Sequence, residues 1–321
     1  MFKNKEGKVR SGWKITAVFA AFLGISLIIG TIVGSIASII LLSQGKLDPT
    51  TMEFTAEGMK DMDQVNFILM LFQEIVLMLT PIIAWKKVMK RPLSNMGLTP
   101  FKKHWKEFIA GLLFGIVSIT LVFLALILTG NAIVESWSPT FSINLLTYLV
   151  LFIFVGLAEE IFGRGYIMAT LRQTRKLPVV IIVSSIIFAL LHGANPGIGP
   201  LPLINLTIFG IMLAYIYIKS GNIWMCIGFH ISWNYFQGNI FGFKVSGTNP
   251  SGLLTTYYES NNLLNGGDFG PEGGLFVTVI LILGFAFIRY YYRNSTFDFM
   301  ASEPENSTLD FIASEAEAKE E

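Results

Sequence analysis

Three ionisable residues, Glu159, Glu160 and Arg164, lie inside a long apolar segment of the chain. A charged side chain at the centre of a bilayer costs on the order of 2.5–3.5 kcal/mol on insertion scales, so such residues usually have a partner and a function. Glu160 and Arg164 are four residues apart and share a helix face, which allows an ion pair. Glu159 points about 100° away from Glu160 and cannot share that arginine in the same way. We therefore predict a structural pair, Glu160 with Arg164, beside a carboxylate that can act as a general acid or base.

Two of the chain's three histidines also lie in apolar segments further along the sequence, His192 and His230. Asn234 follows His230 by four residues, so the two share a helix face. A glutamate can deprotonate water, an imidazole can orient that water, and His or Asn donors can stabilise an oxyanion. Glu159, His192, His230 and Asn234 are thus the predicted catalytic residues of a hydrolase. The alternative, that these polar groups only hold helices together, stays open at this point.

A metal is a second possibility for the same residues. Zinc accepts imidazole nitrogens and carboxylate oxygens, and its ligands here would be Glu159, His192 and His230. The H-E-x-x-H pattern of soluble metalloproteases is absent from the sequence. The single cysteine, Cys226, excludes a zinc site built from cysteines. A zinc-dependent mechanism and a metal-free glutamate mechanism both remain compatible with the sequence.

The composition is that of a polytopic membrane protein. The chain of 321 residues is 53% hydrophobic and 14% charged, whereas soluble domains contain about 25% charged residues. The net charge of +1 gives no reason to expect a nucleic-acid partner. A helix needs about 20 apolar residues to span the hydrocarbon core. About eight segments meet that length, and they are roughly 15–44, 65–85, 108–130, 143–171, 178–194, 200–218, 222–243 and 273–289.

The loops between these segments predict the orientation. Every second loop is rich in Lys and Arg, as in 86–106 and 172–176, and the N-terminus is equally basic. The alternate loops, such as 46–64 and 131–142, are poor in both residues. Since basic loops stay in the cytoplasm, both termini are predicted to be cytoplasmic. The predicted fold is an all-α, multi-pass bundle of about eight transmembrane helices in the cell membrane.

The sequence divides into three parts. Residues 1–14 are a basic cytoplasmic N-terminus, and 15–293 form the transmembrane domain, with its motif core in 143–243. Residues 294–321 are an acidic tail that we predict to be cytoplasmic and disordered. This tail is partly duplicated, because NSTFDFMASE (294–303) recurs as NSTLDFIASE (306–315).

Three short motifs carry a resemblance to a known family. They are EEIFGR (159–164), FALLH (188–192) and HISWN (230–234), in this order on three hydrophobic segments. They resemble the E-E-x-x-x-R, F-x-x-x-H and H-x-x-x-N motifs of the CAAX prenyl endopeptidase and bacteriocin-processing family of intramembrane proteases, also called the Abi family. The motif region covers roughly a quarter of the chain.

The resemblance implies a helical bundle around a polar cavity, with a site inside the membrane that opens toward the cytosol. By that resemblance Glu159 would activate the water and His192 would help to position it. His230 and Asn234 would bind or polarise the scissile carbonyl. The pair Glu160–Arg164 would support the site. Members of the family are described either as metalloproteases or as glutamate-dependent proteases without a metal.

The predicted function is therefore endoproteolysis of a membrane-associated peptide or protein. The family offers two substrate classes, a C-terminal tail with a lipidated cysteine and a peptide precursor linked to bacteriocin immunity. One alternative is a non-catalytic membrane immunity factor or scaffold. Another is an ion-coupled transporter in which Glu159, Glu160 and Glu74 relay ions, but the internal repeats typical of transporters are not evident. Glu74 could line the same cavity, whereas Asn205 suits a hydrogen bond between helices.

Overall fold

The computed structural model describes residues 2–4, 7–138 and 142–301. In this part of the chain the α-helices are α1 (Ser11–Ser43), α2 (Ala56–Ile83), α3 (Phe101–Leu128), α4 (Ile143–Glu160), α5 (Ala169–Leu171), α6 (Leu177–Leu191), α7 (Pro200–Ser220), α8 (Trp224–Tyr235) and α9 (Leu275–Tyr291). Wider π-helical turns extend three of them, at η1 (Ala84–Val88), η3 (Ile161–Met168) and η5 (Phe236–Ile240). Short 3-10 turns lie at η2 (Leu93–Met96), η4 (Arg172–Thr174), η6 (Gly267–Phe269) and η7 (Pro271–Gly273). Strands β1 (Ile133–Trp137) and β2 (Leu254–Tyr257) form one antiparallel pair.

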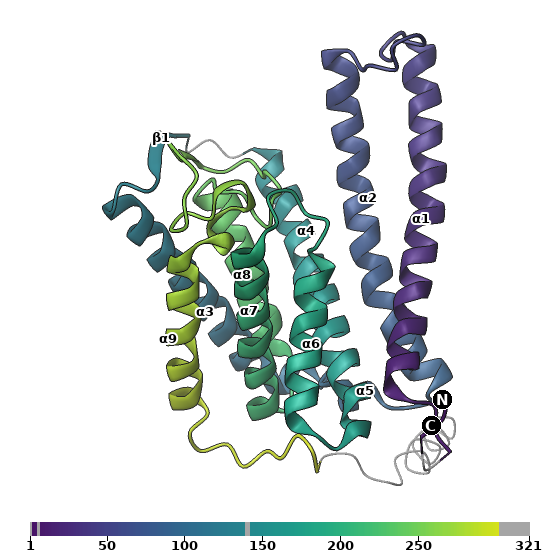
Figure 1. Cartoon of the computed structure of the whole chain (residues 1–321), viewed down its shortest axis with the longest axis vertical. Coiled ribbons are helices and arrows are strands. Elements are labelled where there is room, and N and C mark those ends of the chain that lie inside the picture. The colour runs from purple at the N-terminus through teal and green to yellow at the C-terminus, as the bar shows by residue number, and fades with distance from the viewer. Residues whose placement is uncertain (1, 5–6, 139–141, 302–321) are drawn as a thin grey trace.

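Each of the segments that the hydropathy predicts contains a helix, so the described chain is mostly helical, as predicted. Among the described residues, 5 helices are long and apolar enough to cross a bilayer, and α6 and α9 are shorter apolar helices. The start of α1 and the end of α9 lie at the same end of the bundle (Figure 1). That arrangement fits an even number of crossings, while the number of spans and the cytoplasmic orientation stay predictions.

The helices are arranged around α8, which packs against α3, α4 and α7. Helices α6 and α7 form a second close pair, and α9 packs against α7 and α3. Helices α1 and α2 form a long hairpin at one side that contacts α4 and α5 and projects beyond the other helices (Figure 1). The outward faces of this hairpin carry exposed Leu and Ile side chains, as expected of surfaces that face lipid.

Part of the acidic tail lies against the bundle. Phe299 is buried, its ring lies under the Arg172 guanidinium at 3.8 Å, and it makes an edge contact with Tyr217. The Ser295 hydroxyl donates to the backbone carbonyl of Lys219 at 2.5 Å. Residues 294–301 are thus held at the end of α7. The remainder of the predicted tail, 302–321, lies outside the described residues.

Glycines allow α3 and α8 to approach closely. A Cβ atom at Gly111 or Gly115 of α3 would collide with the backbone of α8, at Met225 and Phe229 respectively. A Cβ at Gly228 of α8 would likewise meet the carbonyl of Phe108. Small residues four apart on facing helices are the usual means of close packing in membranes, where apolar side chains gain little by leaving lipid. This contact fixes the rotation of α8 and therefore the direction in which its polar side chains point.

Gly115→Leu is expected to reduce the stability of the bundle by about 1–3 kcal/mol or more, because overpacking forces the two backbones apart. The matched control is Gly30→Leu in α1, since a Cβ at Gly30 has no heavy atom within 4 Å. Thermal unfolding of both variants in the same detergent would measure the difference. Equal melting temperatures for the two variants would contradict the proposed role of the glycine.

Candidate active site

The three motifs lie on α4, α6 and α8, and the structure brings them together. Glu159 and Glu160 are the last residues of α4, which continues directly into the π-helical turns of η3. His192 caps the C-terminal end of α6, one residue beyond the helix. His230 and Asn234 lie one turn apart on α8. A π-helical insertion changes the direction of the residues that follow it, and such insertions are frequent at functional sites.

Glu160 is the centre of a buried polar cluster. Its Oε1 accepts a hydrogen bond from Arg164 Nη1 at 3.0 Å and a second from His230 Nδ1 at 2.9 Å. Both partners of the Glu160–Arg164 ion pair are almost completely shielded from solvent. The Arg164 guanidinium also lies over the Phe188 ring at 4.3 Å, a distance suited to a cation–π contact. The pair predicted from the i, i+4 spacing therefore exists, and it also orients one of the two histidines.

Glu159 faces both imidazoles. Its Oε2 lies 3.8 Å from His192 Nε2 and 3.9 Å from His230 Nε2. These separations exceed a direct hydrogen bond. One water molecule can bridge two atoms at this separation, with a hydrogen bond of ordinary length to each. The three atoms are thus arranged to hold a water molecule next to a carboxylate.

The other nitrogen of each imidazole is already bonded. His192 Nδ1 donates to the backbone carbonyl of Phe188 at 3.0 Å, because that oxygen can only accept. His230 Nδ1 donates to the Glu160 carboxylate. In the neutral tautomers, both rings therefore present Nε2 to Glu159 as an acceptor. His230 can donate from Nε2 only when the ring carries a second proton.

A cavity of about 520 Å³ contains these groups. Glu159, His192, His230 and Asn234 all line it, so the four predicted catalytic residues share one cavity. Its size lies in the range of pockets that bind ligands. The rest of the lining is mostly apolar and comes largely from α1, α2, α4 and α6, with residues such as Phe19, Phe22, Leu77, Leu151 and Phe152.

The lining also includes the loop segments 194–195 and 245–248, at the end of the bundle opposite the start of α1 and the end of α9 (Figure 1). The opening of the cavity toward the cytosol, which the family resemblance implies, stays a prediction.

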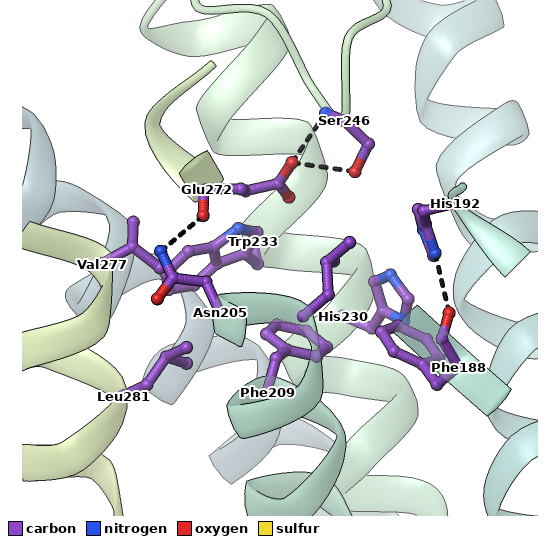
Figure 2. Close-up of a pocket in the computed structure, with 11 residues that line it drawn as sticks. Phe188, His192, Asn205, Phe209, His230, Trp233, Ser246, Glu272, Val277 and Leu281 are labelled. Carbon is purple, nitrogen blue, oxygen red and sulfur yellow. Dashed lines mark hydrogen bonds between the residues drawn. The ribbon is translucent and has the colours of Figure 1, made fainter. Parts of the chain in front are cut away.

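Ser246 lines the cavity and is bonded to Glu272, and neither residue is among those predicted from the sequence. Glu272 Oε2 accepts hydrogen bonds from the Ser246 amide at 2.6 Å and from its hydroxyl at 2.8 Å. Figure 2 shows the Glu272 carboxylate turned toward Ser246 and its backbone carbonyl turned toward Asn205, which donates at 2.8 Å. Asn195 Nδ2 donates to the Ser246 carbonyl from the other side at 2.9 Å. The segment 245–248 is thereby fixed as one wall of the cavity.

These residues surround a second, much smaller pocket of about 10 Å³ beside His192 and His230. That volume approaches the space of a single water molecule and leaves no room for a substrate. The pocket in Figure 2 is therefore too small for a substrate, and the larger cavity is the candidate site. Asn205, predicted as a helix-packing residue, joins α7 to the loop before α9 through Glu272 and Gly274.

Burial raises the pKa of the Glu272 carboxyl above its ordinary value, and the hydrogen bonds from Ser246 oppose that rise. The folded protein then keeps a proton on Glu272 at pH values where the unfolded chain has released it, so stability falls as the pH rises through this window. Glu272→Gln cannot titrate and is expected to flatten this part of the curve of melting temperature against pH. The exposed Glu135→Gln serves as control and should keep the wild-type slope. Identical slopes for wild type and Glu272→Gln would contradict the assignment.

Glu159, His192 and His230 are also the zinc ligands that the sequence leaves possible. Within residues 2–4, 7–138 and 142–301, no three His, Cys, Asp or Glu side chains are grouped so as to hold a metal ion. The steps proposed below use only the chain's own side chains.

Comparison with known protein families gives a match to the middle of the chain. Residues 139–236 match the family described as Type II CAAX prenyl endopeptidase Rce1-like. The matched segment, less than half of the chain, contains all three motifs and confirms the family that they indicate. Neither the curated proteins nor the solved structures give a significant match to the chain.

Proposed function

We propose that the protein is an intramembrane endopeptidase of the cell membrane that hydrolyses a peptide bond in a membrane-associated substrate. The observation that carries this proposal is the convergence of Glu159 Oε2 with His192 Nε2 and His230 Nε2, at 3.8 and 3.9 Å, on a cavity with an apolar wall. A carboxylate and an imidazole acceptor can together orient and deprotonate one water. The family match of residues 139–236 supports the same class of reaction.

In the first step, the water donates one hydrogen bond to Glu159 and the other to His192 Nε2. Its oxygen then attacks the carbonyl carbon of the substrate while Glu159 takes the proton. His192 is held for this purpose by its bond to the Phe188 carbonyl, which leaves Nε2 free to accept. The product of this step is a tetrahedral intermediate with a negative oxygen.

His230 and Asn234 are the groups placed to stabilise that oxygen. Both line the cavity with Glu159, and both come from the same face of α8. His230 donates from Nε2 in its protonated form, which the Glu160 carboxylate supports from the opposite nitrogen. Glu159 then passes its proton to the leaving amine, so that the hydroxyl of the water ends on the acyl carbon and its proton on the nitrogen.

The test compares new peptide termini in cells that produce wild-type protein or Glu159→Gln at equal membrane levels. Termini found only with the wild type would support proteolysis and identify the substrate. If a phenotype that depends on the protein survives Glu159→Gln and no such termini appear, the protein acts by binding, as a membrane immunity factor or scaffold would.

A further inference from the structure

The tail that follows α9 is bound to the bundle through one short segment, residues 294–301. Its anchor is Phe299, whose residue surface is only 2% exposed. The Arg172 guanidinium lies over the Phe299 ring at 3.8 Å, and the Tyr217 ring meets it edge-on with 5.0 Å between the ring centroids. A cation over an aromatic face and an edge-to-face ring pair are both attractive contacts. Phe299 therefore fills a site of defined chemistry on the bundle.

Other residues of the segment fix its position and its shape. The Ser295 hydroxyl donates to a backbone carbonyl of α7 at 2.5 Å, and the Phe297 ring lies so close to Gly221 that a Cβ atom there would come within 2.8 Å of it. The Asp298 carboxylate accepts hydrogen bonds from two amides further along the segment, at 2.9 and 3.1 Å, and so forms a turn. We call the residues that receive the segment the tail-binding surface, namely Arg172, Tyr217 and Gly221.

The sequence contains this segment twice. Residues 294–303 read NSTFDFMASE, and residues 306–315 read NSTLDFIASE. The serine, the aspartate and the anchoring phenylalanine recur as Ser307, Asp310 and Phe311, and the two positions that differ exchange one apolar residue for another. Every side chain that makes one of these contacts in the first copy therefore has an equivalent in the second.

The length of the linker explains why the first copy is the one bound in the structure. A segment on a short flexible linker has a local concentration of about millimolar, which falls roughly as the −3/2 power of the linker length. The second copy begins twelve positions after the first, so its linker from the end of α9 is longer by that number of residues. Its local concentration is thus roughly ten- to twentyfold lower, which disfavours the second copy but leaves it able to bind.

We propose that the tail-binding surface is a binding site for the repeated motif, and that residues 306–315 of the same chain occupy it whenever residues 294–303 leave it. The second copy then covers Arg172 and Tyr217 in place of the first. This interaction is independent of the proposed catalysis, because no residue of the tail-binding surface lines the large cavity.

The experiment measures binding of a fluorescein-labelled peptide of residues 306–315 to full-length protein in detergent, by fluorescence anisotropy. The double variant Phe299→Ala with Phe311→Ala weakens both tethered copies and should leave the surface open to the peptide. The wild type should bind the peptide at least about tenfold more weakly than the double variant, because its first copy competes. Phe299→Ala alone should bind it at least about threefold more weakly than the double variant, because its second copy competes. Phe311→Ala alone should match the wild type.

Two further measurements support the reading of these affinities. A control peptide with alanine in place of Phe311 should bind the double variant at least about tenfold more weakly than the original peptide, since it lacks the anchor. Melting temperatures of the same four proteins report the tethered copies themselves, because a bound segment stabilises the folded state. Each single variant should melt close to the wild type, and the double variant should lose more than the sum of the two single losses.

Equal affinity of Phe299→Ala and the double variant for the peptide would overturn the proposal, because the second copy would then not occupy the surface. The same affinity in all four proteins would place the peptide elsewhere and would also overturn it. So would a lack of peptide binding together with additive losses in melting temperature. If Phe299→Ala forms dimers that the double variant does not form, the second copy binds a neighbouring molecule, and the assignment to the same chain is wrong.

Discussion

Glu159→Gln is expected to lower kcat for peptide cleavage by about 10²–10⁴-fold, the range typical of losing a general base. The substitution keeps the size of the side chain and removes its ability to accept a proton. It leaves the Glu160–Arg164 and Glu160–His230 bonds intact, because neither involves Glu159. The thermal stability of the variant should therefore stay close to that of the wild type.

The measurement is single-turnover cleavage in vesicles together with a melting curve on the same preparation. The control is Glu259→Gln, which removes an exposed carboxylate far from the motifs in sequence and should change neither quantity. Activity of Glu159→Gln within tenfold of the wild type would show that another group deprotonates the water. A large loss of stability would instead assign Glu159 to the structural cluster.

Glu160→Leu, unlike Glu159→Gln, is expected to reduce the free energy of unfolding, by about 3–5 kcal/mol. Removal of one partner from a buried ion pair leaves the other charge without compensation, here the Arg164 guanidinium. The variant also removes the acceptor that holds His230 Nδ1. Folded protein should become scarce, and the folded fraction should cleave more slowly than the wild type. Melting temperature and activity per folded molecule would separate the two effects.

The double variant Glu160→Leu with Arg164→Met tests this explanation. Replacement of a whole buried ion pair by apolar residues is often neutral for stability, so the second substitution should restore much of what the first one loses. Activity should stay low, because His230 still lacks its acceptor. The control is Asp268→Asn, which breaks the solvent-exposed ion pair with Lys244 and should leave the melting temperature close to that of the wild type. Recovery of activity together with stability would refute the orienting role of Glu160.

The helices and the Glu160–Arg164 pair could be predicted from the sequence because they depend on the pattern of neighbouring residues along the chain. The length of an apolar run determines whether a helix can cross the hydrocarbon core, so all the predicted segments are helical in the structure. The four-residue spacing of Glu160 and Arg164 predicts their ion pair, which is present at 3.0 Å. Two element boundaries differ from the prediction. The fourth segment does not continue as a regular α-helix but becomes π-helical at Ile161, and His192 lies just beyond α6 and not within it.

Contacts between distant segments could not be derived in this way. Glu160 bonds His230 across 70 positions of sequence, and Glu272 bonds Ser246 from a Gly-rich loop that shows no periodic pattern. The position of Glu74 in the cavity wall likewise depends on α2 lying against α4. Such contacts are decided by the rotation and depth of each helix, which the packing of neighbouring helices sets.

By itself, the sequence determined that this protein is mostly helical with long apolar segments, that polar residues lie within those segments, and which family these residues indicate. These properties follow from the length of apolar runs and from side-chain spacing, both of which are local. Only the tertiary structure decided that Glu159 faces two imidazoles through their Nε2 atoms, that Glu160 orients one of them, and that these groups line one cavity. The physical reason is that close contacts such as that between α3 and α8 fix how each helix is turned, and no local pattern encodes that rotation.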